Sequence, residues 1–179
     1  PAAPASSPFY FCLPQSWFVL AFIFPIFCAW SLPKILKNLS IVYPNSLYKV
    51  YSRSHLPDWI NSYADKYPRG YGYWTWKPYL INELLSHLSD GDILLYVDGR
   101  TGMPDKSKQI MWFNKFIESP YIDICAWQMR HVEQTWCSMD LISALGAKGN
   151  PAILESGQFA ATYCALRVSS KTRKLSKQW

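Results

Sequence analysis

The pattern of apolar and charged positions changes near residue 40. Residues 1–33 carry no charge, and positions 17–30 form a continuous apolar run interrupted by Pro25. This run is shorter than the ~20 residues of a membrane-spanning helix. Three interpretations stay open for residues 1–39: a membrane anchor or interfacial segment, a truncated signal peptide, and a non-native leader. From residue 40 to residue 179 the pattern predicts one soluble domain.

Helical periodicity recurs within this domain. A helix is predicted over 55–68, with Pro57 in its first turn, and a second is predicted to begin with Pro78 at its first position. The second helix has an apolar stripe with a spacing of four residues, formed by Leu80, Leu84 and Leu88. Further helices are predicted over 109–118 and 136–147.

Strands alternate with these helices. Residues 93–97 form an apolar run without alternation, which is typical of a strand buried on both faces of a sheet. Other strands are predicted over 48–53, 121–127 and 159–168. Helices that alternate with buried strands predict an α/β fold, here a three-layer domain with a mostly parallel sheet.

Composition narrows the classes of function. The chain of 179 residues is 50% hydrophobic and 17% charged, which allows a substantial core and disfavours disorder. Its net charge of +6 fits phosphate-bearing ligands or an anionic surface. The basic residues are scattered except at 167–177, which is not the footprint of a nucleic-acid-binding protein. The five cysteines show no CxxC pairing, so we expect buried free thiols.

The segment before the second helix suits an anion. It contains two glycines, Gly70 and Gly72, which permit close approach of the backbone to a ligand. The free N–H groups at 78–80, with Lys77 adjacent and Arg69 nearby, are typical of a phosphate site at a helix N-terminus. The alternative is a solvated Lys77 beside aromatic side chains that belong to the core.

A second candidate position lies at the carboxyl end of the buried strand. Asp98 ends this strand, and ligands of open α/β sheets bind outside the carboxyl ends of strands. We expect Asp98 to bind a metal or a sugar hydroxyl, with a simple turn residue as the alternative. His131, Glu133 and Gln158 are candidates for the same crevice, and Asp140 lies on a predicted helix.

Two segments carry a resemblance to a known family. They are RGYGYWTWKP at 69–78 and DGDILLYVDG at 90–99, followed by weaker landmarks at His131, Glu133, Trp136, Asp140, Ser156, Gly157, Gln158 and Trp179. Together they resemble nucleotide-sugar glycosyltransferases of the GT-A type over residues 40–179. The resemblance implies a GT-A fold, in which an acidic motif that ends a core strand holds Mn²⁺ or Mg²⁺ against the diphosphate of the donor.

On this resemblance, Asp98 is the metal ligand, and Arg100 occupies the place of a second Asp. One carboxylate with several waters is an acceptable set for such ions, and the alternative is that Arg100 supplies the charge without a metal. The cofactor-binding set would comprise Arg69, Gly70, Gly72, Trp74, Trp76, Lys77, Arg100, His131 and Gln158. Trp74 or Trp76 would stack on the base or sugar. Candidates for the catalytic base are Glu133, Asp140 and Glu155.

The function expected from this resemblance is transfer of a sugar from a nucleoside-diphosphate donor to a glycan or other hydroxyl acceptor. A non-catalytic sugar-binding domain and a membrane-associated structural protein are the alternatives. Lys34 and Lys37 follow the apolar run, so we expect a cytoplasmic or membrane-associated domain, with the Golgi lumen as the alternative. The absence of an initial Met and the basic pattern before Trp179 predict a fragment that lacks its C-terminal part.

Overall fold

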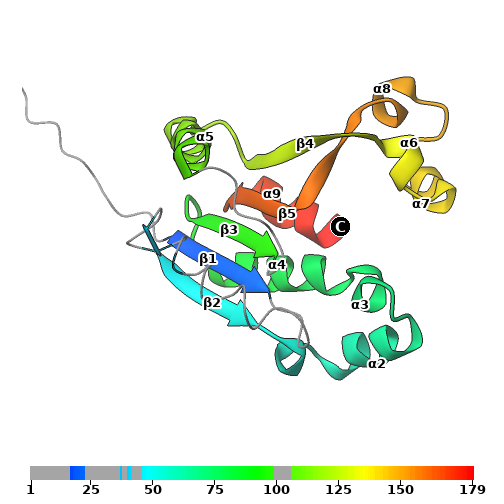
Figure 1. Ribbon diagram of the computed structural model, residues 1–179, viewed down its shortest axis with the longest axis horizontal. Helices are drawn as coiled ribbons and strands as arrows, with labels where there is room; N and C mark the ends of the chain where they lie inside the picture. Colours follow the sequence, from blue (N-terminus) through cyan, green and yellow to red (C-terminus); the bar gives the residue numbers. More distant parts are fainter. Residues whose placement is uncertain (1–16, 23–36, 38–39, 42–45, 99–105) are drawn as a thin grey trace, which may run out of the picture.

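The computed structural model describes residues 17–22, 37, 40–41, 46–98 and 106–179, with the backbone alone for 17–22, 106–107 and 109–110. It is a mixed α/β fold, which confirms the predicted class (Figure 1). Its helices, in chain order, are η1 (Arg53–His55), α2 (Asp58–Lys66), α3 (Gly70–Tyr73), α4 (Trp76–His87), α5 (Lys106–Glu118), α6 (Glu133–Trp136), α7 (Met139–Ala144), α8 (Pro151–Leu154) and α9 (Ser170–Gln178).

The described strands form one sheet in the order β2–β1–β3–β5–β4. Their bounds are Trp17–Phe22 for β1, Leu47–Tyr51 for β2, Ile93–Asp98 for β3, Ile124–Val132 for β4 and Gly157–Arg167 for β5. β2, β1 and β3 are parallel, whereas β5 runs antiparallel to both β3 and β4. The sheet is therefore mixed, and the prediction of a mostly parallel sheet missed the reversal at β5. A strand covered on both faces is equally apolar in either direction, so its composition does not reveal that reversal.

Helices pack on both faces of β3. Leu94 and Tyr96 belong to a core cluster that includes much of α4, while Leu95 and Val97 belong to a second cluster with Phe113 of α5. Every residue from Ile93 to Val97 is no more than 1% exposed. The prediction of a strand buried on both faces is thus confirmed.

The apolar run at the start of the chain supplies the central strand of the parallel part. Residues 17–22 pair with β2 on one side and β3 on the other. They therefore belong to the same sheet as β2 and β3, which lie beyond the boundary expected between residues 39 and 40. A short central strand and a membrane anchor share the same apolar pattern. Residues 23–36, the rest of that run included, lie outside the described residues, and no described helix is long and apolar enough to cross a membrane.

The glycine-aromatic segment forms an unusual turn. Positive φ angles occur at five consecutive residues, from Gly70 to Trp74. Hydrogen bonds hold the turn, because the Tyr73 N–H donates to Arg69 O at 2.8 Å and the Trp74 N–H donates to Gly70 O at 3.1 Å. Left-handed backbone costs about 1–2 kcal/mol for each L-residue, so the surrounding packing must offset this strain.

The turn also changes where α4 begins. The helix starts at Trp76, so Pro78 lies within its first turn and is not its first residue. The free N–H groups were therefore expected at the wrong positions, 78–80, because the helix begins two residues before Pro78. The Lys77 N–H donates to Trp74 O at 2.9 Å, so the turn already uses one of the N–H groups that the helix start would offer a phosphate.

β4 is longer than predicted. Pairing with β5 continues to Val132 opposite Gly157, with irregular register after Ala126. His131 therefore lies on the strand and Glu133 directly follows it. The single helix expected over 136–147 is instead divided between α6 and α7, with Ser138 accepting from the Leu141 N–H as the N-cap of α7.

Replacement of Gly72 by alanine tests the left-handed turn. An added Cβ would lie 2.9 Å from Tyr63 Cδ1 and 3.4 Å from the Ala64 backbone, at a φ of +74°. We expect a loss of about 2–4 kcal/mol in the free energy of unfolding, measured by urea denaturation. Gly146→Ala is the matched control, because its φ is +67° and nothing lies within 4 Å of an added Cβ. Its expected loss is about 1 kcal/mol; equal losses for both variants would contradict a tightly packed turn.

Candidate functional site

The carboxyl ends of three strands meet at one edge of the sheet. The chain passes from β1 to β2 on one side and then to β3 on the other side of β1. Ligands of open α/β sheets bind outside the carboxyl ends at such a reversal. Asp98 ends β3 here, in register with Phe22 at the end of β1. The structure thus places Asp98 at the position where this topology favours a ligand.

Lys77 and Asp98 form an ion pair at this edge. The Nζ of Lys77 lies 2.8 Å from Oδ2 of Asp98, and their side chains are 6% and 22% exposed. The same ammonium donates to the carbonyl of Ala161 on β5 at 3.1 Å. It also lies 5.4 Å from the ring centroid of Trp76 and 5.5 Å from that of Tyr96. Sequence analysis expected Lys77 to face phosphate and Asp98 to face metal separately, but the two side chains bind each other.

Tyr96 holds the other carboxylate oxygen. Its hydroxyl donates to Oδ1 of Asp98 at 3.3 Å. Burial first, and then the charge of Asp98, raise the pKa of Tyr96 well above its usual value. The hydroxyl therefore keeps its proton and remains a donor at neutral pH. Asp98 is thus fixed from both oxygens, with part of its surface left toward solvent.

A divalent cation does not fit this arrangement of described residues. The resemblance implies Mn²⁺ or Mg²⁺ on Asp98, yet Oδ2 of this carboxylate already accepts a hydrogen bond from the ammonium of Lys77. A metal on this carboxylate would lie about 4–5 Å from the ammonium of Lys77, where the +1 and +2 charges repel by about 7 kcal/mol at an effective dielectric constant of about 20. Within the described part of the chain, no three His, Cys, Asp or Glu side chains gather as a metal site.

The glycine-aromatic turn divides its two tryptophans between core and surface. Trp76 is 1% exposed, and its indole N–H donates to Gly70 O at 3.2 Å. It packs in the core and is therefore not the one of the two tryptophans that is available for stacking on a base or sugar. Trp74 is 45% exposed and remains a candidate for stacking. Gly70 and Gly72 shape the turn, since a Cβ on Gly70 would lie 2.6 Å from the Trp74 ring.

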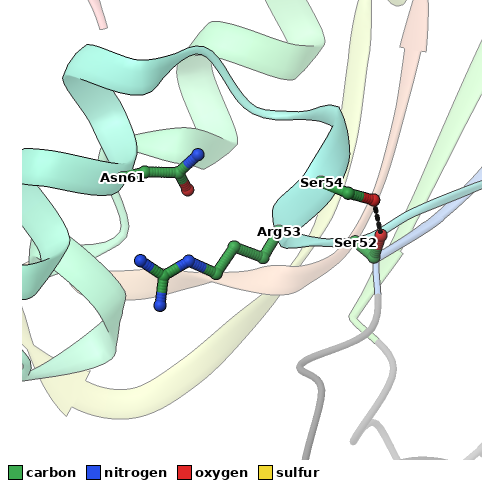
Figure 2. Close-up of a pocket in the computed structure, with 4 residues that line it drawn as sticks. All are labelled: Ser52, Arg53, Ser54 and Asn61. Atoms are coloured by element: carbon green, nitrogen blue, oxygen red, sulfur yellow. Dashed lines mark hydrogen bonds between the residues drawn. The ribbon is translucent and has the colours of Figure 1, made fainter.

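An open pocket lies beyond the carboxyl end of β2. Ser52, Arg53, Ser54 and Asn61 line it, and Figure 2 shows the two serine hydroxyls joined by a hydrogen bond, with Arg53 and Asn61 beside them. The Arg53 guanidinium lies 5.4 Å from the ring centroid of Tyr71, whose hydroxyl donates to Asn61 at 2.7 Å. The aromatic turn therefore borders the pocket.

Sequence analysis missed this pocket. The rule that selected Asp98 applies equally to Ser52–Ser54, because they lie at the carboxyl end of a strand, predicted over 48–53, that proves to be parallel to β3. Arg53 also forms a bidentate pair with Asp65, with both oxygens at 2.9 Å. The position of these residues at the carboxyl end of a strand could have identified the pocket, although no residue motif marks it.

Other predicted residues gather on a distal arm, which we define as residues 128–160. Figure 1 shows α6, α7 and α8 at the end of the β4–β5 hairpin, which projects away from the other strands. Glu133 accepts a hydrogen bond from Cys137 Sγ at 2.9 Å, and Gln158 Nε2 lies 4.0 Å from the same sulfur. The rings of His131 and Trp136 are 5.0 Å apart.

The distal arm lies beyond the end of β3. Ala161 contacts the ammonium next to Asp98, whereas Gly157 lies opposite the last residue of β4, directly before Glu133. Four steps of extended strand separate Ala161 from Gly157, which correspond to about 13 Å. Asp98 and Glu133 are therefore placed at the two ends of a span of this size and not side by side.

Four predicted residues remain, and one of them, Glu155, is exposed at the C-terminal end of α8. Arg69 is exposed at the start of the aromatic turn, and Asp140 is exposed in the first turn of α7. Arg100 lies outside the described residues. Arg69 is therefore a surface cation beside the turn, whereas Asp140 belongs to the distal arm.

Comparisons of the chain with protein-family models, curated proteins and solved structures found no match. The functional interpretation accordingly depends on the geometry of the carboxyl edge and on the residues of the two segments described above.

Removal of the buried ammonium tests the central ion pair. Lys77→Met leaves the Asp98 carboxylate without its cation, so we expect the free energy of unfolding to fall by about 3 kcal/mol in urea denaturation. Asp65→Asn is the control, because it breaks a pair with Arg53 whose side chains are 47% and 62% exposed. Its expected loss is below about 1 kcal/mol. Similar losses in both variants would show that the Lys77 pair contributes no more than a surface contact.

The thiol of Cys137 gives a pH-dependent test of the distal arm. Burial, and then the hydrogen bond and charge of Glu133, raise its pKa to about 11. Because only the thiolate is alkylated, we expect the rate of iodoacetamide labelling to rise about tenfold per pH unit up to about pH 11. Glu133→Gln removes a carboxylate that favours the thiol form, so labelling at pH 9 should accelerate. Mass spectrometry of the Cys137 peptide measures both rates, and an unchanged rate in the variant would contradict the contact.

Proposed function

We propose that this chain is a glycosyltransferase domain of the GT-A type, which binds a nucleoside-diphosphate sugar at the carboxyl edge of the sheet and transfers the sugar to a hydroxyl acceptor. The observation that carries this proposal is the position of Asp98, fixed by Lys77 and Tyr96 at the reversal between β1 and β3. The resemblance of the two segments at 69–78 and 90–99 supports the same function.

The pocket beyond β2 suits the nucleoside part of the donor. Ser52, Ser54 and Asn61 supply hydroxyl and amide groups that pair with base edges or ribose hydroxyls. Arg53 adds a guanidinium, whose planar donors match phosphate oxygens. Trp74 offers an exposed ring for stacking. A donor seated here would direct its sugar toward Asp98.

The reaction breaks the bond between the anomeric carbon and the diphosphate, and the electron pair leaves with the diphosphate oxygen. Cations must balance this developing negative charge. The candidates with exposed side chains are Arg53, which would have to exchange its partner Asp65 for the diphosphate, and Arg69 at the start of the aromatic turn. Asp98 accepts hydrogen bonds from the sugar hydroxyls, because its carboxylate is fixed and partly open to solvent.

The distal arm is the candidate acceptor side. In an inverting transfer, the acceptor hydroxyl gives its proton to a carboxylate while its oxygen attacks the anomeric carbon. Glu133 is half-buried and points at the Cys137–Gln158 group, whereas Asp140 is exposed on α7. The base must lie within hydrogen-bond reach of the attacking hydroxyl, whereas the arm begins about 13 Å from Asp98. Glu133 and Asp140 are therefore candidates for the base only if the donor sugar extends from Asp98 toward the arm.

Replacement of Asp98 tests this proposal. In the full chain we expect binding of a UDP-sugar or a GDP-sugar, measured by calorimetry across a panel of both. Asp98→Asn should bind the same donor at least tenfold more weakly, which corresponds to about 1.4 kcal/mol in binding free energy. Asp90→Asn makes the same chemical change before the opposite end of β3, where Asp90 pairs with Arg173, and should bind as the wild type does.

Three results would count against the proposal in different ways. Equal donor binding by Asp98→Asn and wild type would remove Asp98 from the site. Binding without sugar transfer or donor hydrolysis would favour a non-catalytic sugar-binding domain. Failure to bind any member of the panel would reject a nucleotide-sugar site.

A further inference from the structure

The charge balance at the carboxyl edge is unusual for a site expected to hold a divalent metal. The pair of Lys77 and Asp98 is neutral as a unit, and the ammonium is more deeply buried than the carboxylate. Lys77 reaches this position from α4, and the carbonyl of Ala161 on β5 fixes it from another side. The cation therefore belongs to the fold itself and is held by three elements of the structure.

We propose that Lys77 is a positioning residue that takes the place of a divalent cation, so that donor binding at Asp98 is independent of metal. This inference rests on the proposed function and concerns the same site. A bound metal would neutralise Asp98 and allow an anionic diphosphate to approach. Lys77 already does so, because its ammonium lies 2.8 Å from the carboxylate oxygen.

The surroundings of Lys77 exclude a simple exchange with a metal. Its side chain lies against the faces of Trp76 and Tyr96, which attract a cation through their π-systems. The Tyr96 hydroxyl donates to the second oxygen of Asp98. A Mn²⁺ ion on the remaining lone pairs of Asp98 would lie close to the ammonium of Lys77, whose positive charge repels it. The arrangement therefore favours the resident ammonium over a soluble cation.

Titration of MnCl₂ alone into the full chain tests the first part of the inference. Electron paramagnetic resonance of free Mn²⁺ measures the binding. The wild type should show no saturable Mn²⁺ binding at Asp98, so its titration curve should match that of Asp98→Asn. Lys77→Gln, which frees the carboxylate, should gain Mn²⁺ affinity by at least about tenfold because the repulsion between the two cations is gone. Lys77→Arg keeps the charge and should behave as the wild type does.

Two outcomes would overturn the inference. One is saturable Mn²⁺ binding by the wild type that Asp98→Asn abolishes. The other is a folded Lys77→Gln protein, verified by circular dichroism, without increased Mn²⁺ affinity. If Lys77→Gln fails to fold, the wild type still decides, through calorimetric titration of UDP and GDP in EDTA and in Mn²⁺. Equal affinity in both solutions supports the inference, and binding that requires Mn²⁺ overturns it.

These results separate the inference from the proposed function. If neither UDP nor GDP binds under any condition, the nucleotide-sugar site is rejected, and the assignment of Lys77 to donor binding falls with it. The Mn²⁺ titration then still reports whether Lys77 keeps a metal away from Asp98, because it uses the metal alone and needs no donor. A metal-dependent donor site would instead preserve the proposed function and reject the role of Lys77.

Discussion

The ammonium of Lys77 connects three elements at the edge where a ligand is expected. It extends from α4, binds the carboxylate that ends β3, and reaches a carbonyl of β5. A buried charge is tolerated only when it is paired, so these contacts hold the helix and both strands in one relative position. The left-handed turn contributes to the same arrangement, because Gly70 accepts the indole hydrogen bond of Trp76, the residue that begins α4 next to Lys77.

Elements whose pattern is local were predictable from the sequence. Residues 93–97 are apolar without alternation, and they form a strand covered on both faces. The apolar stripe of α4 that contains Leu80 and Leu84 faces the hydrophobic core, as helical periodicity requires. The position of Asp98 at a carboxyl end followed from the same local pattern. These predictions succeeded because burial on a helix face or a strand face leaves a regular signal in neighbouring residues.

Features that depend on distant pairing were not predictable. The direction of β5 leaves no trace in its composition, although β5 pairs antiparallel with both β3 and β4. Lys77 and Asp98 are separated by a helix and a turn in the sequence. The sequence therefore suggested two independent ligand sites and not one ion pair. The pocket at Ser52 and Asn61 exists because the turn that carries Tyr71 folds back onto it. The run at 17–22 left a membrane anchor, a signal peptide and a non-native leader open as interpretations, because a central strand is equally apolar.

The central place of β1 in the sheet has a consequence for the order of assembly during synthesis. Phe22 pairs with Asp98, and β2 lies on the opposite side of β1. A ribosome releases the chain from its N-terminus, so β1 emerges long before its second neighbour. Non-local parallel pairs of this kind form slowly, and the exposed apolar strand is prone to aggregation during that interval. The ligand edge, which needs β1, β2 and β3 together, is therefore among the last parts of the parallel sheet to become complete.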